Sequence, residues 1–384
     1  MRSKRGIIAL AVAFAATFVF VGTRPAQAMP PFAQAYGENC EVCHSAVPAL
    51  NAYGRYVQRT GYSSLDAATI HRAIPLWIGE NPTFDSQDAV FPHKIVAGNF
   101  ALHAVGFIGR DWTFHAQQWI TQANQSGGTD TLWLTYNNLF HRDGHLFIGK
   151  LQAPGPSPYN QWFELNGFAA PAITVGEHGY QIGGTRWGTK LSYTRDWLLA
   201  EAAYMGNNGD LNTATDFSND TDKSLDWRLA YGRPDKPTEF GVFGTGGVLP
   251  ISNGTIDRYN ATSVYGEVDS EGVLPGLFAV YQTGHDPNPG PGLGAASSRA
   301  FSVDMYHPFF NQRVMLGLRQ EYTDDGLGTI GHSTNADFEW LAIRSVGDRN
   351  ATGLLANAEA VMAPGAGPDW KYQLWYVTTV GPLH

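Results

Sequence analysis

The segment Asp111-Trp-Thr-Phe-His-Ala-Gln-Gln-Trp-Ile120 decides how most of the chain folds, because its side chains alternate between apolar and polar. A period of two is typical of a β-strand with one apolar and one polar face. We predict one face toward lipid and the other toward an aqueous lumen. The lipid-facing set is Trp112, Phe114, Ala116 and Ile120, and the lumen-facing set is Thr113, His115 and Gln117.

Segments of the same kind recur over the rest of the chain, each about ten residues long and bounded by turn residues, as in transmembrane β-barrels. Clear cases are residues 94–108, 112–123, 131–140 and 370–380. From residue 94 onward the pattern predicts about fifteen strands, and residues 74–84 supply one more, which gives the even number usual in such barrels. The fold class predicted is therefore all-β, an antiparallel transmembrane β-barrel of about 16 strands, uncertain by about two.

The predicted connections alternate between short and long. Short ones lie at 109–111, 195–196, 233–237 and 269–272, and long ones at 152–178, 207–224, 284–298 and 324–334. In outer-membrane barrels the short turns are periplasmic and the long loops extracellular. The alternative is a soluble periplasmic β-sandwich or propeller, which does not explain why Trp and Tyr recur near strand ends.

Composition excludes other classes. The chain of 384 residues has a formal net charge of −9, whereas a protein that binds nucleic acid presents positive charge. Only 15% of the residues are charged and 13% are aromatic, which suits strands with one apolar face. After residue 28 no apolar stretch approaches the roughly 18 residues of a membrane-spanning helix. We therefore expect no nucleic-acid partner and no helical membrane domain.

The first 28 residues are predicted to be a signal peptide. Basic residues at 2–5 precede an apolar run at 6–21, and Pro25-Ala-Gln-Ala28 offers small residues for cleavage. The alternative is a retained membrane anchor, although the apolar run is short for that role. We expect export through the Sec pathway and, with the predicted barrel, a location in the outer membrane of a Gram-negative bacterium.

The only two cysteines of the chain lie in Cys40-Glu-Val-Cys43-His44. This is the attachment signature of a c-type haem, in which two thiols on a helical turn bind the porphyrin and the adjacent imidazole ligates the iron. We predict one covalent haem c on these residues, with His44 as the proximal ligand. The alternatives are a redox-active disulfide, which needs no adjacent His, and a zinc site, which needs more ligands.

The sixth ligand of the iron stays open. His71 and His93 are the nearest downstream histidines, and lumen-facing His103 and His115, on neighbouring strands, are further candidates for a distal ligand or a propionate contact. The ordinary interpretation of each is a polar side chain in a loop or a wet pore; Met29 and an iron with no sixth ligand are also possible. Arg55 is a candidate partner of a propionate, or a surface residue.

Residues 31–62 resemble the opening of the fused monohaem c-type cytochrome–porin family, which includes outer-membrane iron oxidases. The shared features are the single haem motif, Pro48-Ala-Leu50, Tyr53-Gly-Arg55 and the closing Gly61-Tyr62. The resemblance implies a small N-terminal helical monohaem cytochrome module at 29–70, after a signal peptide at 1–28. It implies that this module plugs or caps a porin-like barrel at 71–384, with Cys40, Cys43 and His44 binding haem.

The function expected is an outer-membrane electron conduit. Single electrons would pass between an extracellular donor, such as Fe(II), and a soluble periplasmic cytochrome c or other carrier, with outer-membrane lipid around the barrel. Whether the protein is an enzyme, an Fe(II) oxidase, stays undecided, as does the direction of electron flow. The alternative is a solute porin with a haem-based gating or sensing module.

Overall fold

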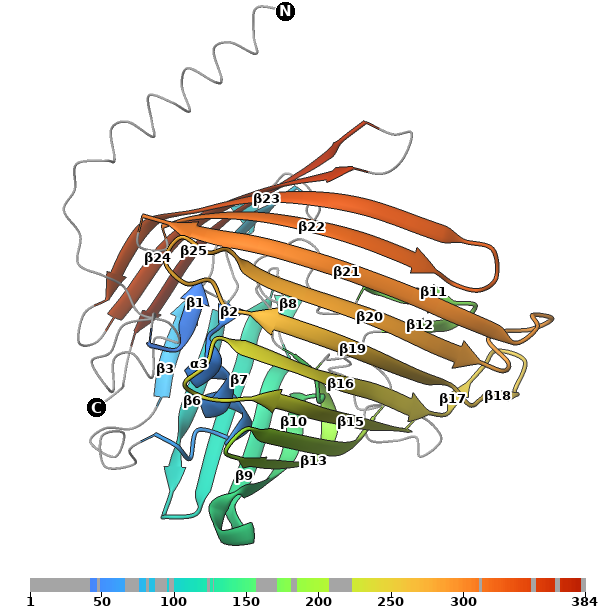
Figure 1. Cartoon of the computed structure of the whole chain (residues 1–384). Helices are drawn as coiled ribbons and strands as arrows, with labels where there is room; N and C mark the ends of the chain where they lie inside the picture. Colours follow the sequence, from blue (N-terminus) through green and yellow to red (C-terminus); the bar gives the residue numbers. More distant parts are fainter. Residues whose placement is uncertain are drawn as a thin grey trace, which may run out of the picture.

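The computed structural model describes the chain in segments: 42–46, 49–65, 76–80, 83–86, 95–96, 100–122, 125–126, 128–156, 171–180, 185–206, 223–310, 313–346, 350–362 and 367–380. Most of these residues belong to one closed antiparallel barrel (Figure 1). No helix among these segments is both long and apolar enough to cross a lipid bilayer.

The barrel wall is built from strands that follow one another in chain order. Their bounds are β3 (Leu76–Glu80), β4 (Thr83–Asp85), β5 (Ile95–Val96), β6 (Phe100–Ile108), β7 (Trp112–Gln122), β8 (Gln125–Ser126), β9 (Thr129–Leu139), β10 (Gly144–Gln152), β13 (Thr185–Arg195), β14 (Leu198–Gly206), β15 (Lys223–Gly232), β16 (Thr238–Gly247), β19 (Asn260–Val268), β20 (Gly276–Asp286), β21 (Ala296–Phe309), β22 (Val314–Asp324), β23 (Ile330–Val346), β24 (Asn350–Met362) and β25 (Asp369–Val380).

The wall closes where its last strand pairs with its first. Thr378 of β25 pairs with Glu80 of β3, and Gln373 of β25 pairs with Asp85 of β4 in the same register, so β3 and β4 occupy one position of the wall. The pairs β5/β6 and β8/β9 likewise each share a position. The described wall therefore has sixteen strand positions, as predicted, and the segment at 74–84 supplies the first of them. Closure removes the unpaired edges that lipid cannot satisfy.

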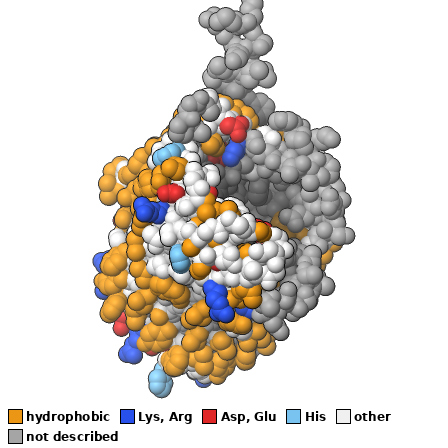
Figure 2. Space-filling model, turned by 90° about the vertical axis from the view of Figure 1, so that its right-hand side faces the viewer, with side chains coloured by type: hydrophobic (Ala, Val, Ile, Leu, Met, Phe, Trp, Pro, Cys, Tyr) orange, Lys and Arg blue, Asp and Glu red, His pale blue; other side chains and the backbone are white. Residues whose placement is uncertain are grey.

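The wall has its apolar side chains outside and its polar ones inside. On β15, Leu225, Leu229 and Tyr231 are exposed, whereas Asp226 and Arg228 between them are buried. Within the opening segment, Thr113 and Gln117 are buried and Ile120 is exposed, which confirms the predicted assignment of its faces at these positions. Figure 2 shows hydrophobic side chains over much of the outer wall, and a hollow in the end of the barrel that carries the long connections.

The predicted turns are present in the described wall. Residues 109–111 join β6 to β7, and residues 233–237 join β15 to β16, as predicted. Asp196 and Trp197 join β13 to β14, one residue later than the predicted turn at 195–196. Two small hairpins that alternation did not predict lie within long connections: β11 (Ile173–Val175) with β12 (His178–Tyr180), and β17 (Leu249–Pro250) with β18 (Ile256–Asp257). These hairpins lie toward the end of the barrel opposite the short turns (Figure 1).

The N-terminal segment differs from the helical module we expected. Its described part has one short helix, α3 (Ala52–Arg59), preceded by a two-stranded sheet of β1 (His44–Ala46) and β2 (Ala49–Leu50), in which His44 pairs with Leu50. The helix α3 begins only after its N-cap Asn51. The described part of the segment therefore shows no cytochrome fold, only a helix, a short sheet and turns.

Candidate functional site

The helix α3 lies inside the barrel (Figure 1). Its side chains bond to strands at different places in the wall, namely β10, β16 and β19. The Asn51 side chain caps the helix by accepting from Gly54 N at 2.9 Å. Its two arginines, Arg55 and Arg59, are four residues apart and so share one face of the helix. Both guanidinium groups are buried against acidic side chains of the wall.

Arg55 and Arg59 tie the helix to three neighbouring strands. Arg55 Nη1 donates to Glu267 Oε1 at 2.9 Å and to Asp269 Oδ1 at 2.6 Å. Arg59 Nη1 donates to Glu239 Oε2 at 3.1 Å, and Glu239 is also paired with Arg228 of β15. Buried ions are tolerated only when they are paired and hydrogen-bonded, and here the partners come from both the helix and the wall.

The electrostatics of the two arginines differ. Desolvation alone would lower the pKa of Arg55, but the nearby carboxylates of Glu267, Glu239 and Asp269 outweigh it and raise that pKa. Desolvation lowers the pKa of Arg59, and the nearby cations Arg228 and Arg55 add to the lowering against the pull of Glu239. Of these two arginines, Arg55 is thus the one whose charge the nearby carboxylates stabilise more strongly.

Further contacts fix the chain after the helix. The Thr113 hydroxyl donates to Gly61 O at 2.5 Å, and the Ser192 hydroxyl donates to Arg59 O at 3.1 Å. The Tyr62 ring packs against Trp133 with ring centroids 5.2 Å apart. The wall residues that bond to this segment all lie within four residues of a short turn; they are Thr113, Ser192, Glu239 and Glu267. The plug, by which we mean residues 42–46 and 49–65, therefore occupies the end of the barrel with the short turns.

The Cys43-His44 turn is held against the start of α3. Asn51 N donates to Cys43 O at 2.9 Å, and Asn51 Nδ2 donates to Val42 O at 3.1 Å. A Cβ added at Gly54 would lie 2.0 Å from Cys43 O, so only glycine permits this approach. Ser45, next to His44, shares a hydrogen bond of 2.9 Å with Tyr306 of β21.

Of the groups that a covalent haem requires, the described residues provide one thiol and one imidazole. Cys43 is half-buried in a turn and His44 is buried at the start of β1, so the described end of the motif is not on the helical turn that we predicted. Cys40, the second predicted thiol, lies outside the described residues, as do His71 and His93. The assignment of Cys40, Cys43 and His44 as haem-binding residues stays a prediction.

The structure places the other predicted site residues as follows. His103 lies on β6 opposite Gln117, and His115 on β7 opposite Val105. The His115 ring nitrogen Nδ1 shares a hydrogen bond of 3.2 Å with Tyr62 OH, so His115 contacts the plug. Arg55 is at the acidic cluster described above. Roles of these three residues toward a haem stay predictions.

The closed wall, its apolar outer face and its polar interior meet the requirements of a bilayer, where every backbone polar group must be paired within the protein. The chain forms an outer-membrane β-barrel. The location predicted, the outer membrane of a Gram-negative bacterium, agrees with this architecture.

No protein-family model matches the sequence, and no curated protein matches it either. Among solved structures it is similar to the outer membrane channel DcaP of Acinetobacter baumannii, with 11% identity over 79% of this chain and 96% of that one, at a TM-score of 0.49. It is similar to the anion-selective porin from Comamonas acidovorans, with 11% identity, 79% and 98% coverage and a TM-score of 0.48. It is also similar to OmpT, an outer membrane protein of Vibrio cholerae, with 12% identity over 79% of this chain and 96% of that one, at a TM-score of 0.46.

Several carboxylates face inward in the described part of β21–β25. They include Asp304, Glu321, Asp337, Glu339 and Glu359; Arg319 pairs with Asp304 and Glu321, and Lys371 pairs with Glu359. Carboxylates that face a lumen attract small cations.

The acidic partners of the plug were not predicted. In the sequence, these partners cannot be told from other polar residues of the alternating pattern: Glu239, Glu267 and Asp269. Arg59 has the sequence context of an exposed residue on a helix. The available signal was the spacing of Arg55 and Arg59, together with acidic side chains at inward positions next to the short turns. Which acid meets which arginine follows only from how the barrel closes.

Proposed function

We propose that this outer-membrane barrel is an electron conduit, in which one haem c on Cys40, Cys43 and His44 accepts and passes single electrons at the end with the short turns. The observation that carries the proposal is the fixed position of the Cys43-His44 turn inside the wall, held by Asn51 and by the buried pairs of Arg55 and Arg59. When bound, the haem would supply one-electron transfer across a wall that lipid makes impermeable to ions.

The chain's own residues have distinct tasks in this proposal. The plug places the Cys43-His44 turn near the periplasmic mouth, where a soluble carrier can approach it. The acidic interior favours a small cationic donor, such as Fe(II), entering from the end with the long connections. His44 would hold the iron from one side, and the buried pairs of α3 keep its backbone from moving relative to the wall.

The test uses the mature full chain, matured in a host that attaches c-type haem. Its haem-specific absorbance is recorded and its potential titrated, and proteoliposomes with oxidised soluble cytochrome c inside are mixed with external Fe(II). We expect reduction of the enclosed cytochrome c, and none with the Cys43→Ser chain. A holoprotein whose haem is not reduced by Fe(II) rules out iron as donor, and a chain without haem after maturation rules out the conduit.

A second candidate, which the described fold supports more directly than the conduit, is a solute porin with a haem-based module that gates the pore. The barrel architecture and the acidic interior favour it, because such a lumen conducts cations when it is open. Single-channel recording in planar bilayers distinguishes the two functions. Cation-selective conductance that changes when nitric oxide is added, with no electron transfer to enclosed cytochrome c, supports the gated porin. The absence of ion conductance through the bilayer, together with electron transfer to enclosed cytochrome c, supports the conduit.

A further inference from the structure

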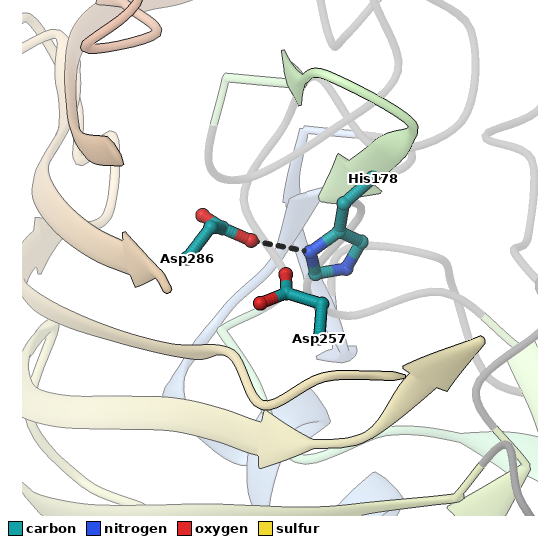
Figure 3. Close-up of side chains that lie close together, drawn as sticks. All are labelled: His178, Asp257 and Asp286. Carbon is teal, nitrogen blue, oxygen red and sulfur yellow. Dashed lines mark hydrogen bonds and ion pairs between the residues drawn. The ribbon is translucent and has the colours of Figure 1, made fainter. Parts of the chain in front are cut away.

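A second cluster of ionisable side chains lies at the opposite end of the barrel from the plug. His178 of β12, Asp257 of β18 and Asp286, the last residue of β20, are all buried (Figure 3). His178 Nδ1 and Asp286 Oδ1 are 2.9 Å apart. One nitrogen or oxygen atom from each of the three residues lies within 4.8 Å of the others. Three segments far apart in the chain thus bring metal-ligating atoms together.

Asp257 supplies the observation that points to a ligand. Its Oδ1 accepts from Asn288 N at 2.9 Å, whereas its Oδ2 is buried and has no hydrogen-bond partner among the described residues. A fully buried carboxylate oxygen without a partner is costly. In Figure 3 the carboxylate of Asp257 points toward the space between the His178 ring and Asp286. A cation in that space would provide the missing partner.

We propose that His178, Asp257 and Asp286 form a binding site for a divalent first-row transition metal ion, with Zn²⁺ as the reference ion. One imidazole nitrogen and two carboxylates form a ligand set that such ions accept, with bonds of about 2.1 Å. Two ligand atoms of a tetrahedral Zn²⁺ site lie about 3.4 Å apart, so the 2.9 Å between His178 Nδ1 and Asp286 Oδ1 would widen by about 0.5 Å when the ion replaces their hydrogen bond. Ca²⁺ fits poorly, because it takes oxygen ligands only.

Neighbouring residues fix the three ligands. The Tyr259 ring packs on the His178 ring with centroids 4.0 Å apart. Asn288, which donates to Asp257, is itself held by a bond of 2.9 Å from its Nδ2 to Thr255 Oγ1. Partners of this kind orient metal ligands before the ion arrives. The geometry is therefore already close to what binding needs.

The site would fasten the β11–β12 hairpin to the wall. Ile173 and Val175 of this hairpin are buried in one cluster with Phe243 and Phe278, which face inward from β16 and β20, so the hairpin lies in the lumen. At its tip, Glu177 N donates to Pro289 O at 2.8 Å, and the Glu177 carboxylate accepts from Ser252 N at 2.7 Å. A metal ion would join the same three segments through stronger bonds, independently of any haem.

The test uses the mature full chain in detergent, stripped with EDTA and titrated with Zn²⁺ by calorimetry, with bound zinc counted by elemental analysis. We expect a site in the wild type that Asp257→Asn loses, with at least about a tenfold fall in affinity. His178→Asn should lose the same site. His285→Asn, which removes an exposed histidine one residue before Asp286, is the matched control and should keep it.

Each outcome bears on the proposal. The cysteine motif is the same in all these chains, so any zinc bound there contributes equally to each of them. The difference between the chains therefore reports the proposed site whether or not haem is attached. Heat-modified mobility on gels shows whether each variant still forms a barrel. Equal zinc content and affinity in the wild type, Asp257→Asn and His178→Asn chains, all folded, would overturn the proposal. Binding of Ca²⁺ as tight as Zn²⁺ would overturn the assignment to transition metals.

Discussion

Arg55 of α3 donates to Glu267 of β19 at 2.9 Å, although the two residues are 212 positions apart in the chain. The pair is buried, and Asp269 and Glu239 complete the environment of the guanidinium group. The plug is therefore part of the folded barrel. Ion pairs hold it there, and neither the arginine of the plug nor the carboxylates of the barrel would be buried without the other.

Replacing Arg55 by alanine should loosen the plug, because it leaves Glu267 and Asp269 buried without their cation. Breaking a buried pair in this way costs about 3–5 kcal/mol. We expect faster proteolysis within residues 42–65 and a rise in single-channel conductance. Arg142→Ala, which removes an exposed arginine paired with Asp111 at the surface, is the control and should change neither. Unchanged proteolysis of the Arg55→Ala chain would contradict the role of the pair.

Gly54→Ala should separate α3 from the Cys43-His44 turn, because its Cβ would lie 2.0 Å from Cys43 O, a backbone atom that cannot turn aside. We expect reduced covalent haem content after maturation, measured by absorbance and by the mass of the intact chain. Gly266→Ala adds a Cβ with no atom within 4 Å and should keep the wild-type content. Full haem content in both chains would show that this close approach is not needed.

Val264→Lys tests which face of the wall meets lipid. Val264 lies at the middle of β19 and is 49% exposed on the outer face. A lysine near the middle of a bilayer costs roughly 2–4 kcal/mol on the lipid face of a barrel. Unfolding by urea in lipid vesicles should show this loss. Ala295→Lys, in the exposed connection between β20 and β21, should cost almost nothing, and equal losses in the two chains would be incompatible with a lipid-facing Val264.

Tyr62→Phe removes the hydroxyl that pairs with His115 Nδ1 at 3.2 Å while it keeps the ring against Trp133. Burial raises the pKa of Tyr62, so the hydroxyl is neutral at physiological pH. We expect the free energy of unfolding to fall by about 1 kcal/mol, the usual contribution of one such bond. Tyr204→Phe, on the exposed face of β14, is the control. A loss as large in Tyr204→Phe would mean that the Tyr62 bond contributes nothing specific.

Most of the wall could be predicted from the sequence because strand geometry is local. Alternation over 111–120 predicted that Thr113 and Gln117 face inward and Ile120 outward, and turn residues marked where strands end. The first strand near residue 76 followed from the need for an even number. The haem motif at Cys40, Cys43 and His44 is equally local, and its role stays a prediction.

The sequence by itself therefore determined the alternation of faces, the strand positions of the barrel and the attachment motif, since each depends on residues close together in the chain. Only the tertiary structure decided that Arg55 meets Glu267, that the plug lies at the short-turn end, and that His178 meets Asp257 and Asp286. The physical reason is closure: the register in which sixteen strand positions close determines which inward side chains face one another across the lumen, and no local pattern records that register.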